Sequence, residues 1–233
     1  MKDIAERLKA IRERIAQAAL RAGRSPKEIK LLAASKTVSV EKIRQAAAAG
    51  VQIFGENYVQ EAREKIKQLK DLGLTWHLIG HLQKNKAKLA VELFDLIETV
   101  DSLSLAEELN RRARARGKIM PILVEVNIGG EKSKAGVAPQ DLLKFIGEIA
   151  PLANLRVCDL MTIPPFREDP EEVRPYFRQL RELAEELKRA AIPGVEIKDL
   201  SMGMSHDFEV AIEEGATIVR LGTAIFGPRP PRT

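Results

Sequence analysis

The feature that most constrains this chain is a regular alternation of short apolar segments with segments of helical periodicity. Eight apolar segments have the length of strands, and a helical segment lies between each consecutive pair. Strands joined in this way pair in parallel through right-handed crossovers, and eight such units predict an α/β fold, the closed (β/α)8 or TIM barrel. The expected strands are residues 30–35, 51–54, 75–79, 96–100, 121–126, 155–160, 196–200 and 217–221.

The expected helices follow from their periodicity and from their end signals. Ser104 and Glu107 form a predicted capping box that opens one helix, and Gly117 ends it. Asp169 is the expected cap of another, with Pro170 at its first position. The remaining expected helices are residues 40–49, 59–70, 84–91, 139–149 and 207–214.

The residues before the first strand predict one extra helix. Ile4, Leu8, Ile11 and Ile15 recur at helical spacing, and we expect this helix to pack across the barrel. The competing fold is an open doubly wound sheet, which usually has a G-x-G-x-x-G turn after its first strand. Residues 35–38 read Ser-Lys-Thr-Val there. Because no change in composition marks a boundary, we expect a single domain over residues 1–227 and a flexible proline-rich tail over residues 228–233.

Composition narrows the class of protein. Of 233 residues, 45% are hydrophobic and 30% are charged, which favours a packed core over disorder. The single cysteine, Cys158, excludes an internal disulfide and a cysteine-built metal site. The apolar segments are too short to span a membrane, and the charged N-terminus does not resemble a signal peptide. We therefore expect a cytoplasmic protein with no membrane partner.

Active sites of (β/α)8 barrels lie where the strands end, so the residues at those ends are the candidate site. Lys36 directly follows the first strand, where an amine can attack a carbonyl carbon, although a solvated lysine is the simpler interpretation. Ser201, Gly222 and Thr223 follow the last two strands, and residues 224–226 can form one helical turn. Hydroxyl and backbone N–H groups at this place favour a phosphate. Together they indicate a ligand with both a carbonyl and a phosphate.

Other charged residues carry weaker signals. Arg220 lies within an apolar strand, so it needs either an acidic partner elsewhere in the barrel or an acceptor on the ligand. His77 and His81 lie on a strand and its exit, so a hydrogen-bonded interior histidine is the favoured interpretation of His77. The basic residues 111–116 suggest nucleic-acid binding, but on a helix they fan around the cylinder and favour a solvated face.

Seven segments in order resemble one known family. They are LLAASKT (31–37), FGENYVQE (54–61), WHLIGHLQKNK (76–86), VEVNIGGEKSKAG (124–136), LMTI (160–163), LSMGMSHDF (200–208) and RLGTAIFG (220–227). The chain resembles the pyridoxal phosphate homeostasis proteins over nearly its whole length. That resemblance implies a single barrel similar to the N-terminal domain of bacterial alanine racemase.

The resemblance also implies roles for individual residues. Pyridoxal 5′-phosphate (PLP) would be the cofactor, held as a Schiff base on Lys36 with Asn57 beside it. Arg220 would face the pyridine nitrogen. The phosphate would be held by Ser201, Gly222 and Thr223.

These roles favour a carrier over an enzyme. An arginine stays protonated and can only donate, so the pyridine nitrogen would remain an acceptor and the ring a weak electron sink. Racemases of related fold also use a second domain, for which this chain leaves no room. We expect a non-enzymatic PLP homeostasis protein that supplies apo PLP-dependent enzymes, acts as a monomer and binds no nucleic acid. The alternatives are a weak amino-acid racemase or other PLP enzyme, and an interaction module that uses residues 111–116.

Overall fold

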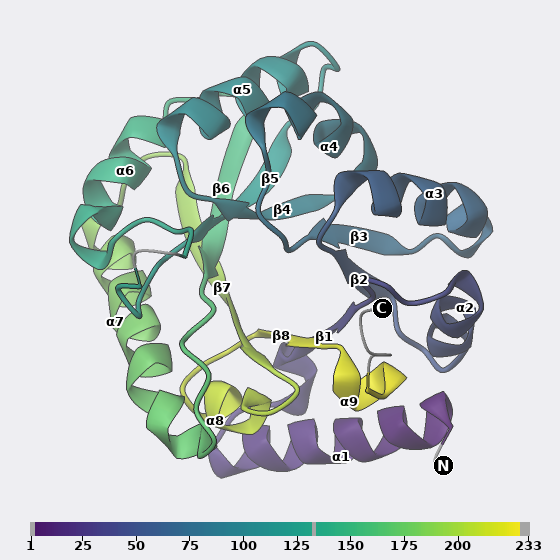
Figure 1. The fold of residues 1–233 in the computed structure, drawn as a ribbon. Coiled ribbons are helices and arrows are strands. Elements are labelled where there is room, and N and C mark those ends of the chain that lie inside the picture. Colours follow the sequence, from purple (N-terminus) through teal and green to yellow (C-terminus); the bar gives the residue numbers. More distant parts are fainter. Residues whose placement is uncertain (1–2, 132–133, 229–233) are drawn as a thin grey trace.

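Parallel strands close into a barrel in the computed structural model of the protein, which describes residues 3–131 and 134–228 (Figure 1). Each strand pairs with the next one in the sequence, and β8 pairs with β1 with Val219 opposite Leu31. The expected (β/α)8 barrel is thereby confirmed. The strands are β1 (Lys30–Ala34), β2 (Ile53–Glu56), β3 (Thr75–Leu78), β4 (Leu96–Val100), β5 (Met120–Glu125), β6 (Leu155–Met161), β7 (Val195–Met204) and β8 (Ile218–Leu221).

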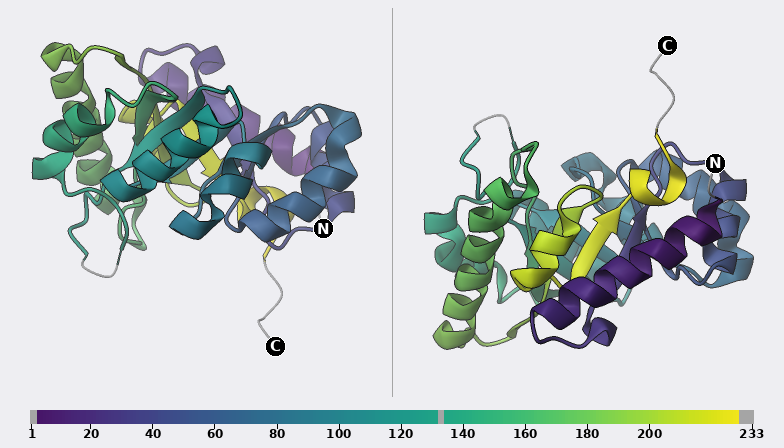
Figure 2. Two further views of the ribbon diagram at one scale, coloured as in Figure 1. Left: turned by 90° about the horizontal axis from the view of Figure 1, so that it is seen from above. Right: turned by 90° about the horizontal axis from the view of Figure 1, so that it is seen from below.

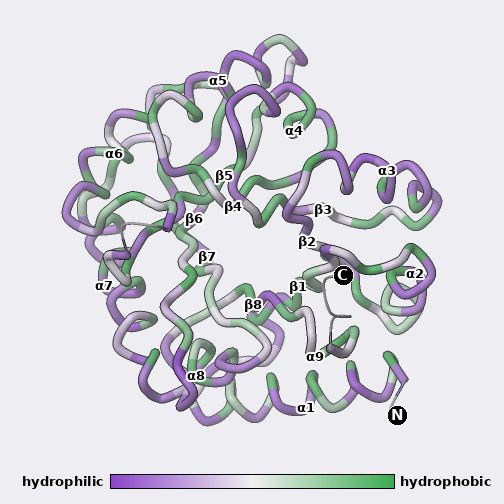
Figure 3. Tube along the Cα trace, viewed as in Figure 1, coloured by the Kyte–Doolittle hydropathy of each residue, from purple (hydrophilic) through white to green (hydrophobic). Residues whose placement is uncertain are grey.

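Helices surround the strands, and along the longer ones hydrophobic and hydrophilic residues alternate as on an amphipathic helix (Figure 3). They are α1 (Ile4–Arg21), α2 (Val40–Ala48), α3 (Val59–Leu69), α4 (Ala87–Leu93), α5 (Leu103–Arg114), α6 (Leu142–Ile149), α7 (Arg174–Ala190), α8 (Phe208–Glu213) and α9 (Thr223–Phe226). Short 3₁₀ turns cover Pro26–Glu28, Lys70–Leu72, Lys84–Lys86, Pro139–Asp141 and Pro170–Val173. In the described ranges, no helix is both long and apolar enough to cross a membrane.

Element boundaries differ from the sequence prediction in several places. The strand expected at residues 51–54 begins two residues later, at Ile53, and β7 continues to Met204 instead of ending at residue 200. The predicted capping box at Ser104 is wrong, because α5 begins at Leu103 and Ser102 is its cap, without a side-chain hydrogen bond. The helices expected at 84–91 and 139–149, and the one expected to begin at Pro170, each open with a 3₁₀ turn.

The N-terminal helix α1 packs against α8 and α9 at the side of the barrel where β8 meets β1 (Figure 2). Asp3 caps it, and Asp3 and Glu6 form a reciprocal capping box. Its apolar face is buried, and Leu8 has no exposed surface. The expectation of an extra helix packed on the barrel is confirmed. Of the expected tail, residues 229–233 lie outside the described residues.

The barrel contains two kinds of interior. Between strands and helices lies the main apolar core, whereas Leu32, Ile79 and Ile218 form a small separate apolar cluster. Some of the residues that point into the barrel from β3, β4, β7 and β8 are polar. They include His77, Glu98, Ser201 and Arg220, all buried. The barrel interior therefore contains both a small apolar cluster and a group of buried polar side chains.

Candidate functional site

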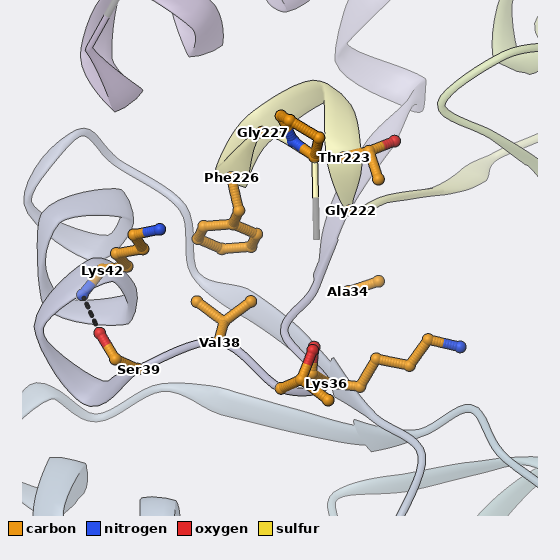
Figure 4. A pocket seen from close by; sticks show the side chains of 11 residues that line it. Ala34, Lys36, Val38, Ser39, Lys42, Gly222, Thr223, Phe226 and Gly227 are labelled. Atoms are coloured by element: carbon orange, nitrogen blue, oxygen red, sulfur yellow. Dashed lines mark hydrogen bonds between the residues drawn. The ribbon is translucent and has the colours of Figure 1, made fainter. Parts of the chain in front are cut away.

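A cavity of about 250 Å³ lies where the strands end. Lys36, Asn57, Arg220, Gly222 and Thr223 line it together, although they come from three different strands and their following loops. A second cavity of about 180 Å³ shares Lys36, Gly222 and Thr223 (Figure 4). In Figure 4 the Lys36 side chain extends away from Val38 and Phe226. The structure thus brings five of the six predicted site residues to one place.

The backbone that carries Lys36 is held in an uncommon conformation. Thr37 has φ of 63°, in the left-handed region that a β-branched residue rarely adopts. Its N–H donates to Glu61 Oε1 at 2.6 Å, which fixes the peptide after Lys36. Because the strand ends at Ala34, this turn decides the direction in which the lysine leaves the barrel.

A buried charged cluster supports that turn from behind. Lys65 Nζ donates to the Ser35 carbonyl at 2.7 Å and to the carboxylates of Glu56 and Glu61 at 2.8 and 2.6 Å. Ser35 Oγ also donates to Glu56 at 2.6 Å. Burial raises the pKa of Glu56, while the hydrogen bonds from Lys65 and Ser35 oppose the rise. These hydrogen bonds link Ser35, the residue before Lys36, to the end of β2 and to α3.

The turn after β8 lines the cavity, and most of its backbone N–H groups are already hydrogen-bonded. Ser205 Oγ accepts the N–H groups of Gly222 and Ala224, each at 3.2 Å. Among the described residues, neither the N–H nor the hydroxyl of Thr223 has a hydrogen-bond partner. Gly222 lies so close to β1 that a Cβ there would be 3.3 Å from the Ala34 carbonyl oxygen. The turn therefore offers the hydroxyl and the backbone N–H of Thr223 to an anion, in the cavity that Lys36 also lines.

Ser201 lies elsewhere than expected. Because β7 continues to Met204, Ser201 is an interior strand residue with no exposed surface, and it does not line the cavity. Its hydroxyl is held by Glu98 and Arg220. Ser205 occupies the strand end instead. The expectation that Ser201 contacts a phosphate does not fit this geometry, and Ser205 fits it.

Arg220 is only 5% exposed and lies on the floor of the cavity. Its Nη1 donates to Ser201 Oγ and its Nη2 to the Thr162 carbonyl, both at 2.7 Å. The acidic partner expected from the sequence is Glu98, one hydrogen bond further away, because Ser201 Oγ donates to Glu98 Oε2 at 2.6 Å. Burial lowers the pKa of Arg220, and the carboxylate of Glu98 opposes that shift.

His77 is an interior histidine, as expected. Its Nδ1 lies 2.6 Å from Glu98 Oε1. Burial alone would raise the pKa of Glu98, but the hydrogen bond and charge of His77 and the charge of Arg220 outweigh it, so the pKa is lowered. His81 is exposed and lies 3.9 Å from Asp101, a long contact. The two histidines therefore do not form a joint site.

Asn57 lines both the main cavity and a neighbouring cavity of about 380 Å³. Tyr58, His81 and Lys86 also line the neighbouring cavity. The Asn57 backbone packs so tightly on Gly80 that a Cβ atom on residue 80 would be 2.4 Å from the Asn57 carbonyl oxygen. This contact fixes the loop after β2 at the cavity rim.

The basic residues 111–116 are largely compensated by nearby carboxylates. Arg111 and Arg112 both pair with Glu108, and Arg116 pairs with Glu92. Such pairs on an exposed helix are typical of a solvated face.

Sequence reasoning missed three contributors to the site, Ser205, Glu98 and Glu61. A signal existed for Glu98, because a glutamate within the apolar strand 96–100 raises the same question as Arg220 does in β8. Ser205 stands within the segment 200–208, but its place depends on where β7 ends.

A parallel barrel with a lysine after β1 and an anion-fitting turn after β8 defines a class, the barrels related to alanine racemase. The sequence family of the alanine racemase N-terminal domain matches residues 7–230. A protein of Aquifex aeolicus named pyridoxal phosphate homeostasis protein is 52% identical over 224 residues, which cover 96% of this chain and 97% of that protein. The chain belongs to the pyridoxal phosphate homeostasis protein family.

Solved structures agree with this assignment. PipY of Synechococcus elongatus PCC7942, solved with PLP bound, is 41% identical with a TM-score of 0.85, and the match covers 97% of this chain and all of PipY. Alanine racemase of Clostridium difficile 630 is 18% identical with a TM-score of 0.71, and the match covers 94% of this chain and 56% of the racemase. The racemase likeness shows the fold alone.

Proposed function

We propose that this protein binds PLP in the cavity at the end of the barrel and holds it as a Schiff base on Lys36. The observation that carries the proposal is the placement of Lys36, an anion-fitting turn and Arg220 around one cavity. The name of the Aquifex relative and the PLP bound to PipY support it.

The chemistry matches the residues present. The neutral Lys36 amine adds to the PLP aldehyde carbon, and loss of one water leaves a C=N bond, so the linkage is reversible by hydrolysis. The phosphate is assigned to the hydroxyl and N–H of Thr223, with the Ser205 hydroxyl in the role first expected of Ser201. Gly222 lets the backbone approach the phosphate closely.

Arg220 is assigned to the pyridine nitrogen and Asn57 to the side of the cofactor. A guanidinium only donates hydrogen bonds, so it keeps that nitrogen unprotonated. A ring in this state withdraws electrons weakly, which disfavours carbanion chemistry. We infer a homeostasis role in which PLP is held reversibly in the cytoplasm and passed to apo PLP-dependent enzymes, without substantial catalysis by this chain.

The test is a PLP titration of the purified protein, followed by visible absorbance of the bound Schiff base. We expect Lys36→Ala to lose the band, and borohydride to fix the cofactor on Lys36, as peptide mass analysis will show. The matched control is Lys88→Ala, at an exposed lysine on α4, which keeps both signals. A wild-type protein that takes up no PLP would overturn the proposal.

The homeostasis role has its own test. Holo-protein is mixed with an apo PLP enzyme, and recovery of that enzyme's activity is compared with recovery in an equal concentration of free PLP. We expect cofactor to transfer from the holo-protein and alanine and serine enantiomers to remain unchanged. Turnover of those enantiomers that Lys36→Ala abolishes would show an enzyme instead.

A further inference from the structure

A continuous chain of buried hydrogen bonds crosses the barrel interior below the cavity. It runs from Arg220 on β8 to Ser201 on β7, then to Glu98 on β4 and finally to His77 on β3. The three links measure 2.7, 2.6 and 2.6 Å. Each of the four residues is at least nine-tenths buried, so these contacts are little exposed to bulk water. Binding of a ligand at the cavity requires only the first of these residues directly.

Glu98 is the carboxylate that best compensates the buried charge of Arg220. Glu125 and Asp207 also act on Arg220, but burial raises the pKa of Glu125 to about 7 and raises that of Asp207 as well. The pKa of Glu98 is instead lowered, because the contacts from His77 and Arg220 outweigh its burial. A buried guanidinium without such a partner would be costly.

The geometry of the chain also fixes the direction of the guanidinium. Glu98 Oε2 accepts the hydrogen bond of the Ser201 hydroxyl, so a lone pair of Ser201 Oγ is left to accept from Arg220 Nη1. His77 occupies the other oxygen, Oε1, and holds the carboxylate in this orientation. With Nη2 held by the Thr162 carbonyl, the guanidinium plane is set by two contacts on different strands or their ends.

We propose that Glu98 is a positioning residue for the cofactor, acting through Ser201 to fix the charge and orientation of Arg220 where it meets the pyridine nitrogen. The inference rests on the proposed PLP function and assigns a role to residues that do not touch the ligand. Partners one step behind a binding group tune it by orienting it.

The test compares PLP with its carbocyclic analogue, in which C–H replaces the ring nitrogen and the aldehyde and phosphate are kept. Dissociation constants of both compounds are measured for the wild type, Glu98→Gln and Ser201→Ala. We expect either substitution to weaken PLP binding about tenfold, as for one weakened hydrogen bond to a charged group, and to leave the analogue nearly unchanged. The selectivity of the wild type for PLP over the analogue would then fall by the same factor.

The matched control is Glu214→Gln. Glu214 is also a buried carboxylate paired with arginines, Arg174, Arg178 and Arg181, but it lies at the helices outside the barrel. The Glu214→Gln variant is expected to have a lower free energy of unfolding and an unchanged selectivity for PLP over the analogue. The proposal would be overturned if Glu98→Gln and Ser201→Ala weakened the binding of both compounds equally. It would also be overturned if both variants bound PLP as tightly as the wild type does. A wild type that binds neither compound would overturn the proposed function itself, which is a separate result.

Discussion

At the scale of single residues, the peptide after Lys36 shows how a site lysine is aimed. Thr37 is held in the left-handed region, which costs a β-branched residue on the order of 1–2 kcal/mol. The hydrogen bond from its N–H to Glu61, together with the Lys65 cluster behind it, offsets that cost. The orientation of Lys36 therefore depends on a carboxylate in α3, 25 positions further along the chain.

Glu61→Ala tests this dependence. The substitution removes the acceptor of the Thr37 N–H and one of two carboxylates at Lys65, so we expect a loss of about 1–3 kcal/mol in the free energy of unfolding. PLP affinity is expected to fall as well, because the turn that carries Lys36 loosens. Urea denaturation and a PLP titration measure the two effects.

The control for that prediction is Glu64→Ala on the same helix. Glu64 is exposed, and among the described residues its carboxylate pairs only with the neighbouring Arg63, so its removal is expected to change stability by no more than about 0.5 kcal/mol. If Glu61→Ala behaves like Glu64→Ala in both measurements, the Thr37 turn does not need its carboxylate.

Most residues of the proposed cofactor site could be predicted from the sequence, but the residues that hold them in place could not. Lys36, Gly222 and Thr223 follow predicted strands, and barrel geometry alone brings such strand ends together. The partners of Arg220 are different, since Ser201 and Glu98 are 103 positions apart and meet only across the closed barrel. No local periodicity encodes a contact of that range, so the sequence could state only that Arg220 needed an acidic partner.

At the scale of elements, the pairing of β6 with β7 is irregular, and the side chain of Asp159 accepts backbone hydrogen bonds at the irregular position. The register shifts between Val157 and Asp159. Asp159 Oδ1 accepts the backbone N–H of Lys198 at 2.7 Å and also that of Asp199. Burial, with a smaller contribution from the nearby Asp199 carboxylate, raises the pKa of Asp159 to about 7. The pairing of β6 with β7 therefore includes hydrogen bonds to a carboxyl group whose raised pKa disfavours its ionised form.

Asp159→Asn is expected to change how stability depends on pH. In the folded state Asp159 keeps a proton that the unfolded chain releases near the ordinary aspartate pKa of 3.8, so the free energy of unfolding falls as pH rises from there to about 7. Asparagine keeps an acceptor oxygen and has no proton to lose. The variant should match the wild type near pH 4 and exceed it near pH 8, by at most about 4 kcal/mol.

Asp71→Asn provides a comparison of opposite sign. The hydrogen bond from Arg44 lowers the pKa of Asp71, so this exposed group stabilises the fold above its unfolded pKa and loses that contribution as pH falls. Its substitution should therefore bring no gain near pH 8. Urea denaturation across the pH range distinguishes the two, and an Asp159→Asn curve parallel to the wild type would contradict the assignment.

The same strand, β7, shows where element prediction from sequence stops. The alternation up to residue 200 was visible, but the continuation through Ser201, Met202 and Gly203 to Met204 contains no run of strand-forming residues. Gly203 adopts φ of 92°, and a Cβ there would be 2.6 Å from the Ala211 side chain. The end of β7 thus packs closely against α8, and the place where β7 ends decides which serine reaches the cavity.

At the scale of the whole molecule, α1 completes the helical layer where the barrel closes. The helices near β8 are short, since α8 covers Phe208–Glu213 and α9 covers Thr223–Phe226. α1 lies over both. Arg24, just after α1, donates to the carbonyls of Ile212 and Ala216 at 2.9 and 2.8 Å. The N-terminal helix is therefore bound to the last two βα units, and the chain's first and final elements stabilise one another.

This arrangement predicts that a substitution that destabilises α1 also destabilises the whole barrel. Leu8 is fully buried, and Leu8→Ala is expected to lower the free energy of unfolding by about 2–5 kcal/mol. The only tryptophan, Trp76, is buried on β3, two strands away from β1. If α1 is integral to the fold, urea transitions followed by Trp76 fluorescence and by far-ultraviolet circular dichroism shift together to lower urea.

The exposed Lys9 on the same helix supplies the control, because Lys9→Ala keeps the helix and removes no buried contact. Its two transitions are expected to stay at the wild-type midpoint. The opposite result would be an early loss of helical signal in Leu8→Ala with the Trp76 transition unmoved. That result would mean that α1 unfolds independently, and the barrel would then have to close between β8 and β1 without it. Because α9 carries Thr223 of the proposed cofactor cavity and packs against α1, PLP affinity should fall in Leu8→Ala only if the two transitions shift together.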